Sequence, residues 1–414
     1  MAPRNEKMTS PWVSDHFWIS PFNFEPDVTS RPEMPVRIKI QDTTLRDGEQ
    51  TPGVVFRGHE KVAIAKMLDM LGVDQIETMA PIVSKEEEVA IRAMVDLDLR
   101  ADLYCGYHAG RKEEELDFAV SLGIDGIGIP VAAGHPRLKY EHPDWTEDDA
   151  INIALGAVSH AKDKGIKVTL TLVDTSRCEK RFLDRMITTV SQKAPPDAIN
   201  ITDTTGCLLP RAAYSLVRFI KQLTAIPIEI HTHNDMGLGL ANTLAAVEAG
   251  AEIVDVSVNG LGERGGNVSL DELVVALHFL YGRKTGIDPR RLTELALMVA
   301  KLSNIPLNRN KPLLGESIFW RESGLGIDLV KEHPLAMFSL VPETLGQKAR
   351  IVLGKKSGLN SIEYKTSELG IKDLNDREQK KRVLAKVKER SAEKKGLIDD
   401  NEFLEIVSSV LTGT

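Results

Sequence analysis

The chain has 414 residues, of which 42% are hydrophobic and 27% are charged, and its formal net charge is −8. This length suits one large domain plus a smaller one, and the acidic balance argues against nucleic acid as a partner. The sequence has no apolar run near the roughly 20 residues of a membrane helix, no signal-peptide core and no paired cysteine spacing, so we expect a cytoplasmic protein without a membrane partner.

Aromatic residues mark the N-terminal segment, residues 1–35. They are concentrated between Trp12 and Phe24, whereas disordered tails are poor in aromatic residues. We therefore predict an N-terminal arm that packs on its own domain or on a partner subunit.

Residues 36–284 alternate short β-rich runs with longer helical patterns. The helical patterns often end in a glycine that leads into the next strand, as at Gly72 and Gly165. Eight such βα units match a (β/α)₈ TIM barrel in number and length. A doubly wound open sheet is the alternative, although open sheets usually have fewer strands. The predicted strands are residues 37–45, 75–79, 101–108, 126–131, 166–174, 198–205, 226–232 and 253–259.

The chain changes character after residue 284. Proline and glycine break residues 285–360 into short pieces, which indicates a linker subdomain with short helices. Helical periodicity returns in residues 361–414, with apolar patterns at 383–387 and 403–407. We predict a small helical C-terminal domain there.

Polar residues gather where the predicted strands end, and the active sites of barrels lie at that face. His231 and His233, two residues apart on a strand, point to the same side and make a natural pair of metal ligands. The segment after the first strand adds a carboxylate at Asp47, a fixed cation at Arg46 and a turn that glycine permits. Further polar strand-end residues are Glu77, His108, Asp203, Thr204 and Asn259.

Three motifs, in this order, resemble the signatures of the metal-dependent acyl-CoA condensing enzymes, the family of homocitrate synthase and 2-isopropylmalate synthase. The motifs are DTTLRDGEQ at residues 42–50, HTHNDMG at 231–237 and NGLGERGGN at 259–267. The similarity continues at 315–324 and 353–358 and covers nearly all of the chain after residue 36. The family is related to 3-hydroxy-3-methylglutaryl-CoA lyase, which shares the barrel and metal motifs.

The resemblance implies roles for the motif residues. Asp47, His231 and His233 match the ligands of a divalent metal ion, and Asn267 matches a further ligand in some members. Arg46 matches the cation that stabilises the developing oxyanion. The positions that match contacts to a 2-oxo acid are Gln50, Glu77 and Thr204, to which we add Thr171 on the fifth strand.

Structural roles are the alternative for several of these residues. Arg46 could simply pair with Asp42 or Glu77. Glu77 and Thr204 could be hydrogen-bonding residues of the scaffold, and Asn267 could be the N-cap of a helix that begins near residue 268.

The sequence departs from the family at positions linked to proton transfer. Gly326 stands where the synthases carry a histidine, Phe338 lies near the place of a partner tyrosine, and Val173, beside Asp174, stands where a glutamate is usual. Thr169 replaces the arginine that binds the distal carboxylate in homocitrate synthase. These departures indicate a divergent branch, such as a Re-type citrate synthase. Candidate substitutes for the acid or base are Tyr107, His108, His135 and Asp174, of which His108 is favoured because it ends a predicted strand.

The resemblance therefore implies an acyltransferase that condenses acetyl-CoA, or another short acyl-CoA, with a 2-oxo acid. Candidate acceptors are oxaloacetate, 2-oxoglutarate and 2-oxoisovalerate. The implied cofactor is a divalent metal ion, Mn²⁺ or Mg²⁺, with Zn²⁺ or Co²⁺ as alternatives. A carbon–carbon lyase and a metal-binding paralogue without condensing activity are the alternative functions. The arm and the C-terminal segment favour a homodimer or a higher homo-oligomer.

Overall fold

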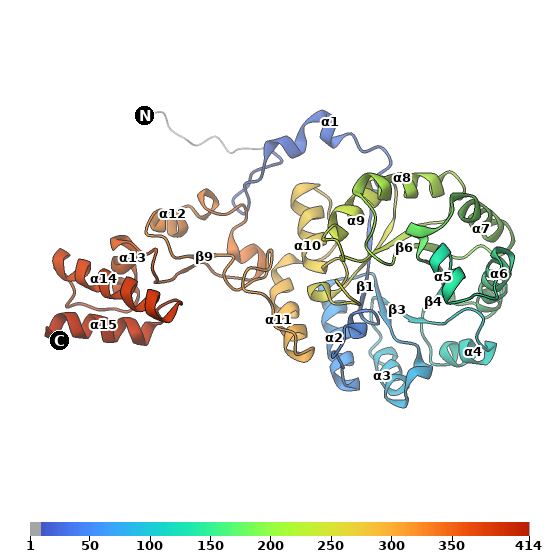
Figure 1. Cartoon of the computed structure of the whole chain (residues 1–414), viewed down its shortest axis with the longest axis horizontal. Coiled ribbons are helices and arrows are strands. Elements are labelled where there is room, and N and C mark those ends of the chain that lie inside the picture. The colour runs from blue at the N-terminus through green and yellow to red at the C-terminus, as the bar shows by residue number, and fades with distance from the viewer. Residues whose placement is uncertain (1–9, 414) are drawn as a thin grey trace. The chain divides into compact units, whose positions relative to one another are not determined.

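A computed structural model of the chain describes residues 10–413 (Figure 1). It divides into two compact units, one of residues 22–307 and the other of residues 308–413 with the arm residues 10–21. The first nine residues of the predicted arm lie outside the described residues, and the finer division at residues 284 and 360 stays a prediction. No helix among residues 10–413 is long and apolar enough to span a membrane.

The larger unit is a closed barrel of eight parallel strands, in chain order, which confirms the predicted fold class. The open-sheet alternative is wrong because β1 pairs with β8 as well as with β2. The strands are β1 (Lys39–Leu45), β2 (Gln75–Thr78), β3 (Asp102–Gly106), β4 (Gly126–Ala132), β5 (Lys167–Val173), β6 (Ala198–Asp203), β7 (Ile228–Thr232) and β8 (Ile253–Val256).

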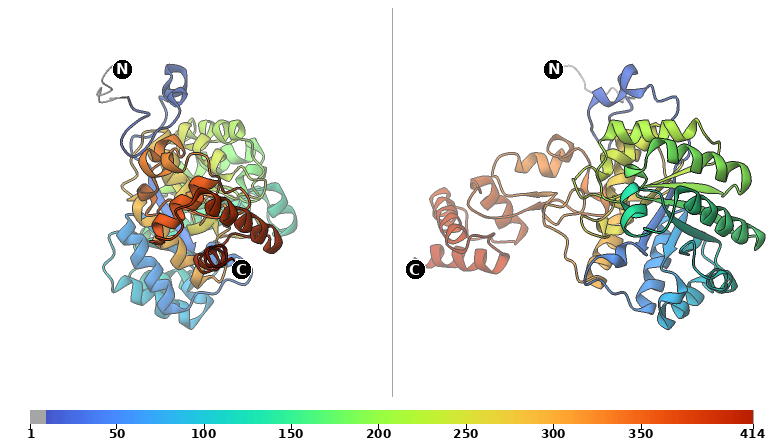
Figure 2. Two further views of the ribbon diagram at one scale, coloured as in Figure 1. Left: turned by 90° about the vertical axis from the view of Figure 1, so that its left-hand side faces the viewer. Right: turned by 45° about the vertical axis from the view of Figure 1, so that its right-hand side comes forward.

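Helices surround these strands, and in Figures 1 and 2 helices α2 and α3, in blue, lie across the barrel from α8 and α9. Short α1 (Pro26–Thr29) precedes the barrel. The barrel helices are α2 (Gly58–Leu71), α3 (Lys85–Val95), α4 (Glu113–Ser121), α5 (His135–Tyr140), α6 (Glu147–Asp163), α7 (Lys180–Lys193), α8 (Pro210–Lys221), α9 (Gly239–Glu248), α10 (Leu270–Val275) and α11 (Leu292–Leu302).

Local sequence explains where these elements begin and end. A reciprocal capping box between Thr146 and Asp149 starts α6, and it satisfies backbone N–H groups that a helix leaves unpaired. Gly72 ends α2 with φ of 102°, a left-handed conformation that glycine adopts at little steric cost. Leu170 and Leu172 on β5 are fully buried, so the outer face of this strand packs under the helices.

Several strand boundaries differ from the predictions, and two of them concern candidate site residues. Strand β3 ends at Gly106, two residues before His108, and β8 ends at Val256. Asn259 has φ of 61° and lies in the following turn instead of the strand. The apolar pattern continued past both strand ends, although the backbone had already turned.

The smaller unit contains the short parallel strands β9 (Trp320–Arg321) and β10 (Arg350–Ile351) and helix α12 (Ile327–Glu332). Helices α13 (Leu359–Glu368), α14 (Arg377–Lys394) and α15 (Asp400–Thr412) follow. They enclose an apolar core that includes Phe403, Val383 and Ile362.

The arm pairs with a segment of its own chain in this smaller unit. Trp18 N donates to Ser339 O at 2.9 Å, and Val341 N donates to His16 O at the same distance. The aromatic residues of the arm therefore belong to an ordered segment, as their number indicated.

Candidate metal centre

Neighbouring strands bring the motif residues together at one end of the barrel. Asp47 follows β1 and precedes the short helix η2 (Gly48–Gln50), whereas His231 lies in β7 and His233 just after it. Strand β8 pairs with both β1 and β7. Asn267 follows β8, so all four side chains meet at the carboxyl ends of three adjacent strands.

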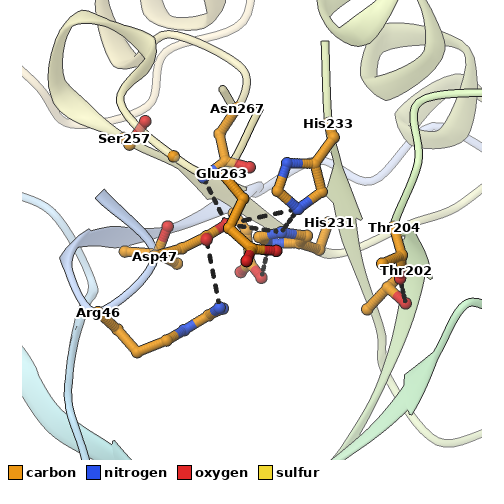
Figure 3. A network of polar contacts seen from close by, with 12 residues as sticks. Arg46, Asp47, Thr202, Thr204, His231, His233, Ser257, Glu263 and Asn267 are labelled. Atoms are coloured by element: carbon orange, nitrogen blue, oxygen red, sulfur yellow. Dashed lines mark hydrogen bonds and ion pairs between the residues drawn. The ribbon is translucent and has the colours of Figure 1, made fainter. Parts of the chain in front are cut away.

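Three ligand atoms converge on one point (Figure 3). The Asp47 Oδ2 atom lies 3.3 Å from His231 Nε2 and 3.5 Å from His233 Nε2. The two Nε2 atoms lie 3.2 Å apart. All three residues are buried and offer ligand atoms within 4.8 Å of one another, which suits a small divalent cation.

Asn267 completes one side of this cluster. Its Nδ2 donates to Asp47 Oδ2 at 2.8 Å and to Leu261 O at 3.2 Å. Its buried Oδ1 has no hydrogen-bond partner among the described residues. Rotating the side-chain amide by half a turn exchanges Nδ2 and Oδ1, so Asn267 can present its oxygen to a cation. The N-cap alternative is wrong because the N-cap position of α10 is occupied by Ser269.

Charge within the cluster also suits a cation. Burial alone would raise the pKa of Asp47, but the charge of Arg46 and the hydrogen bond from His231 outweigh it and hold this pKa below its usual range. Burial would lower the pKa of His231, but hydrogen bonds to Asp255 and Asp47 raise it to about 9. Burial and the charge of His231 lower the pKa of His233 to about 3. An incoming cation would therefore displace a proton from His231.

Arg46 lies beside the cluster and is held by Glu77. The Arg46 Nε donates to Glu77 Oε2 at 2.8 Å, and Arg46 Nη1 lies 3.9 Å from Asp47 Oδ1. Burial would lower the pKa of Arg46, but the charges of Glu77 and Asp47 raise it further. The pairing with Glu77 that we considered is present, and it fixes a permanent cation next to the candidate metal ligands.

The turn that carries Asp47 is anchored from behind by a buried lysine. Lys61 on α2 bonds Glu49 of η2 at 2.5 Å and also bonds Glu87 on α3. The other oxygen of Glu49 accepts a hydrogen bond from Phe56 N at 3.0 Å. Two helices therefore hold the turn in place, which restricts the freedom of Asp47.

The remaining predicted residues are distributed around the same end of the barrel. Gln50 is exposed at the end of η2, and Thr171 is half-buried in β5. His108 is exposed in the loop after β3, yet neighbouring protein atoms desolvate it and, together with Arg111, lower its pKa. The structure does not place these three side chains in contact with the buried cluster.

Thr204 and Asp174 form a separate buried arrangement. Asp174 adopts φ of 65°, and its backbone N–H donates to Thr204 Oγ1 at 2.9 Å and to Thr202 Oγ1 at 2.8 Å. Its carboxylate bonds Arg177 and fills the space where Gly134 lacks a side chain. Asp174 therefore shapes the end of β5 and is not accessible as an acid or base.

The other two candidate acids occupy different surroundings. The Tyr107 hydroxyl donates to Arg111 O at 2.8 Å and so supports the loop after β3. His135 is exposed as the first residue of α5. Of the four candidates, His108 combines exposure at this end of the barrel with a neutral imidazole.

Sequence reasoning missed several polar residues around the cluster. Figure 3 shows Glu263, from the loop after β8, pointing toward Asp47 and His231. Asp255 Oδ2 lies 3.0 Å from His231 Nδ1, and Glu229 lies two residues before His231 in β7. The period-two alternation of Glu229, His231 and His233 was the available signal, because alternate strand residues share a face.

Two family models match the chain. The model described as HMGL-like matches residues 37–299. The model described as homocitrate synthase post-HMGL domain-like matches residues 313–395. Together they span both compact units.

Curated relatives match most of the chain. The 2-isopropylmalate synthase of Methanocaldococcus jannaschii is 40% identical over 381 residues, which are 91% of this chain and 72% of the relative. The homocitrate synthase AksA of Methanothermobacter thermautotrophicus is 36% identical over 394 residues, 95% of this chain and 98% of the relative. The (R)-citramalate synthase CimA of M. jannaschii is 37% identical over 373 residues, 90% and 74% of the two chains.

Solved structures resemble the barrel unit in fold. The HMG-CoA lyase of Bacillus subtilis has a TM-score of 0.59 at 18% identity and covers 68% of this chain and 98% of its own. The hydroxymethylglutaryl-CoA lyase of Pseudomonas aeruginosa has a TM-score of 0.57 at 18% identity, with 65% and 94% covered. Identities this low establish a shared fold alone.

Proposed function

This chain belongs to the HMGL-like family, and we propose that it joins acetyl-CoA, or another short acyl-CoA, to a 2-oxo acid in a Claisen-type condensation that depends on a divalent metal ion. Its relatives are named synthases, and the chain is an enzyme of the same acyltransferase type. The product would be a 2-hydroxy acid that carries a new carboxymethyl group, with free CoA as the second product.

One observation carries this proposal. Asp47, His231 and His233 present three ligand atoms within 4.8 Å of one another, and Arg46 is fixed beside them by Glu77. A carboxylate with two imidazoles leaves coordination positions open for a substrate. A 2-oxo acid offers a carboxylate and a ketone oxygen that together can fill such positions.

Asp47, His231 and His233, with Asn267 as a further ligand, would hold Mn²⁺ or Mg²⁺, and the same donors also suit Zn²⁺ or Co²⁺. When bound, the ion would act as a Lewis acid that polarises the ketone and offsets the charge of the alkoxide. Arg46 would donate hydrogen bonds to the same oxygen, where negative charge develops.

The bond changes balance without a further reactant except water. A base removes a proton from the methyl group of acetyl-CoA, and the enolate carbon bonds to the ketone carbon. The carbonyl electron pair moves onto its oxygen, which then takes a proton. Water hydrolyses the thioester and releases the CoA thiol, which makes the condensation irreversible.

We assign the base to His108. Its lowered pKa keeps the imidazole neutral at neutral pH, which is the form that accepts a proton. Gln50, Glu77, Thr171 and Thr204 remain our proposed contacts to the 2-oxo acid. Of these, Glu77 also orients Arg46.

The acceptor is proposed at the level of a class. Oxaloacetate, as in a Re-type citrate synthase, 2-oxoglutarate and 2-oxoisovalerate are the candidates. The second family match, at residues 313–395, favours a synthase over a carbon–carbon lyase, because its description names homocitrate synthase. A paralogue without condensing activity is the remaining alternative.

Release of free thiol from acetyl-CoA tests the proposal. We expect release with Mn²⁺ or Mg²⁺ and one acceptor from a panel of oxaloacetate, 2-oxoglutarate, pyruvate and 2-oxoisovalerate, and we expect a chelator to stop it. Release without any acceptor would contradict a condensation. No release with any acceptor would favour the lyase or the inactive paralogue.

Metal content tests the ligand assignment separately. We expect Asp47→Ala and His231→Ala to lose bound metal and turnover while circular dichroism stays unchanged. His278→Ala, which alters a histidine outside the cluster, should keep both. Wild-type metal content in Asp47→Ala or His231→Ala would reject the assignment.

A further inference from the structure

The barrel interior below the candidate metal ligands is polar instead of apolar. Gln41, Asn200, Glu229 and Asp255 come from four different strands, and each is at most 4% exposed. Barrel interiors are usually filled by branched apolar side chains. Burying four polar side chains destabilises the fold unless they are paired, so their arrangement calls for an explanation.

Asp255 connects this interior group to the cluster. Its Oδ2 lies 3.0 Å from His231 Nδ1. Carboxylate oxygens accept hydrogen bonds, and the tautomer of His231 that suits this contact is the one with the proton on Nδ1. The opposite nitrogen, Nε2, faces Asp47 Oδ2 and His233 Nε2. The contact therefore turns the lone pair of the neutral imidazole toward the place where a cation would bind.

Two amide side chains hold Asp255 in turn. Gln41 Nε2 donates to Asp255 Oδ1 at 3.0 Å, and Asn200 Nδ2 donates to Asp255 Oδ2 at 2.9 Å. Both amides also donate to Glu229 Oε1. The Asp255 carboxylate is thus fixed from two sides by β1 and β6, and its rotation is restricted.

His233 has no comparable support. Its Nδ1 is buried without a hydrogen-bond partner among residues 10–413. The two imidazoles are therefore inequivalent, since a carboxylate sets the orientation and tautomer of His231 alone.

We propose that Asp255 is the positioning residue of the metal centre and that it acts through His231, with Gln41 and Asn200 setting its own orientation. This inference rests on the proposed metal-dependent function and deepens it. Carboxylates that accept from the outer nitrogen of a metal-binding histidine raise its basicity and fix its direction. The polar residues of the barrel interior would then increase metal affinity, and they would do so in the space where other barrels have apolar side chains.

Metal binding by the purified metal-free protein tests the proposal without any substrate. Asp255→Asn keeps the size of the side chain but loses the carboxylate that receives the Nδ1 proton. We expect the dissociation constant for Mn²⁺, measured by calorimetric titration, to rise roughly 10- to 100-fold. An unchanged dissociation constant would overturn the proposal.

Asp203→Asn is the matched control. Asp203 is fully buried at the end of β6, which pairs with the His231 strand β7, and its carboxylate accepts hydrogen bonds from Cys207 N and Leu208 N. We expect this variant to bind Mn²⁺ like the wild type. An equal loss of Mn²⁺ affinity in both variants would show that replacing any buried carboxylate in this part of the barrel has the same effect. That outcome would also overturn the proposal.

The Nδ1 proton of His231 gives a second readout that a merely structural residue would not move. In ¹H–¹⁵N spectra of the protein with Zn²⁺ bound, the signal of this proton, assigned by its loss in His231→Ala, should exchange slowly with solvent because Nδ1 donates to Asp255. In Asp255→Asn we expect this proton to exchange faster. An unaltered exchange rate would contradict the positioning role.

If Asp255→Asn does not fold, a second variant tests the proposal. Gln41→Met removes one donor to Asp255, and we expect a smaller loss of Mn²⁺ affinity in the same direction. No loss in folded Gln41→Met would then overturn the chain of positioning contacts. Failure of the proposed function is distinguishable, because it would leave Mn²⁺ binding intact while no acceptor supports thiol release.

Discussion

Asp47 shows, at the scale of single residues, how this barrel keeps polar groups where burial disfavours them. It is 1% exposed and shares its surroundings with two buried imidazoles. Burying such groups destabilises a fold unless each one is paired or binds a metal ion. Clusters of this kind lie at functional sites, because evolution retains them for chemistry and stabilises the fold elsewhere.

Asp42 is a second buried carboxylate, and it gives a prediction about stability. Burial raises the pKa of Asp42 from 3.8 to about 7, and its Oδ2 has no hydrogen-bond partner in the described part of the chain. The folded state therefore binds this proton more tightly than the unfolded state. Its contribution to stability is largest below about pH 4, falls as the pH rises toward 7 and is constant above that.

We predict that Asp42→Asn removes this pH dependence. Between about pH 4 and 7, the free energy of unfolding of the wild type should fall relative to that of the variant by roughly 4 kcal/mol. Urea denaturation followed by tryptophan fluorescence at pH 4.5, 6 and 8 measures the difference. A difference that stays constant across these three pH values would reject the assignment to Asp42.

The loop after β8 is the element with the most unusual backbone. Asn259, Gly260, Arg264 and Gly266 all have positive φ, between 54° and 76°. Its middle is held in place, since Thr51 Oγ1 both accepts from Gly262 N and donates to Gly262 O. Strained backbone of this kind is kept at functional sites, and this loop brings Asn267 to the proposed metal ligand Asp47.

We predict that Gly266→Ala breaks this loop. A Cβ at this position would lie 2.0 Å from Gly260 O, and φ is +76°, so the backbone must move. The strained conformation disfavours alanine by roughly 1–2 kcal/mol, and the clash adds roughly 1–3 kcal/mol. We expect weaker Mn²⁺ binding, measured by calorimetry, because Asn267 is displaced.

Gly165→Ala is the matched control for the backbone term. Gly165 has φ of +75° with nothing within 4 Å of an added Cβ, and it lies between α6 and β5. This variant should lose stability only through the cost of placing alanine at a positive φ, and it should keep its Mn²⁺ affinity. Equal Mn²⁺ affinity in both variants would show that the loop does not position a ligand.

An apolar rim at the C-terminal end of the barrel gives a prediction for the whole molecule. Large apolar side chains are exposed on the loops that follow β1, β2, β4, β6 and β7. They are Val55 (74% exposed), Ile82 (52%), Tyr140 (74%), Leu209 (66%) and Met236 (69%). Exposed apolar side chains are typical of interaction surfaces where they form a patch, and these five all lie on segments at the same end of the barrel.

We predict a homodimer or a higher homo-oligomer in which this rim is covered. Sedimentation velocity at micromolar concentration should give at least twice the chain mass of 45.7 kDa. Met236→Glu should weaken association roughly tenfold or more, whereas Val36→Glu, which alters an exposed residue before β1, should not. A monomeric wild type would contradict the prediction.

The sequence determined the fold class, and it singled out the residues that the structure brings together in the candidate metal centre. Alternating β-rich and helical runs, with glycines at the helix ends, specify successive βα units, because these signals are local. His231 and His233 were identifiable as a pair because every second residue of a strand points to the same face. The motif residues at 42–50 were identifiable because a carboxylate and a cation follow a strand end.

Only the tertiary structure decided what supports those residues. Asn267 meets Asp47 across 220 positions of the chain, and Gln41 meets Asp255 across 214. Both contacts exist because β1 closes against β8, and no local signal specifies which side chains face each other across that seam. The N-cap alternative for Asn267 was wrong because the N-cap position of α10 lies two residues later, at Ser269. Asp174, one of four candidate acids, is buried by contacts with β6 and with Gly134 that no local signal specifies.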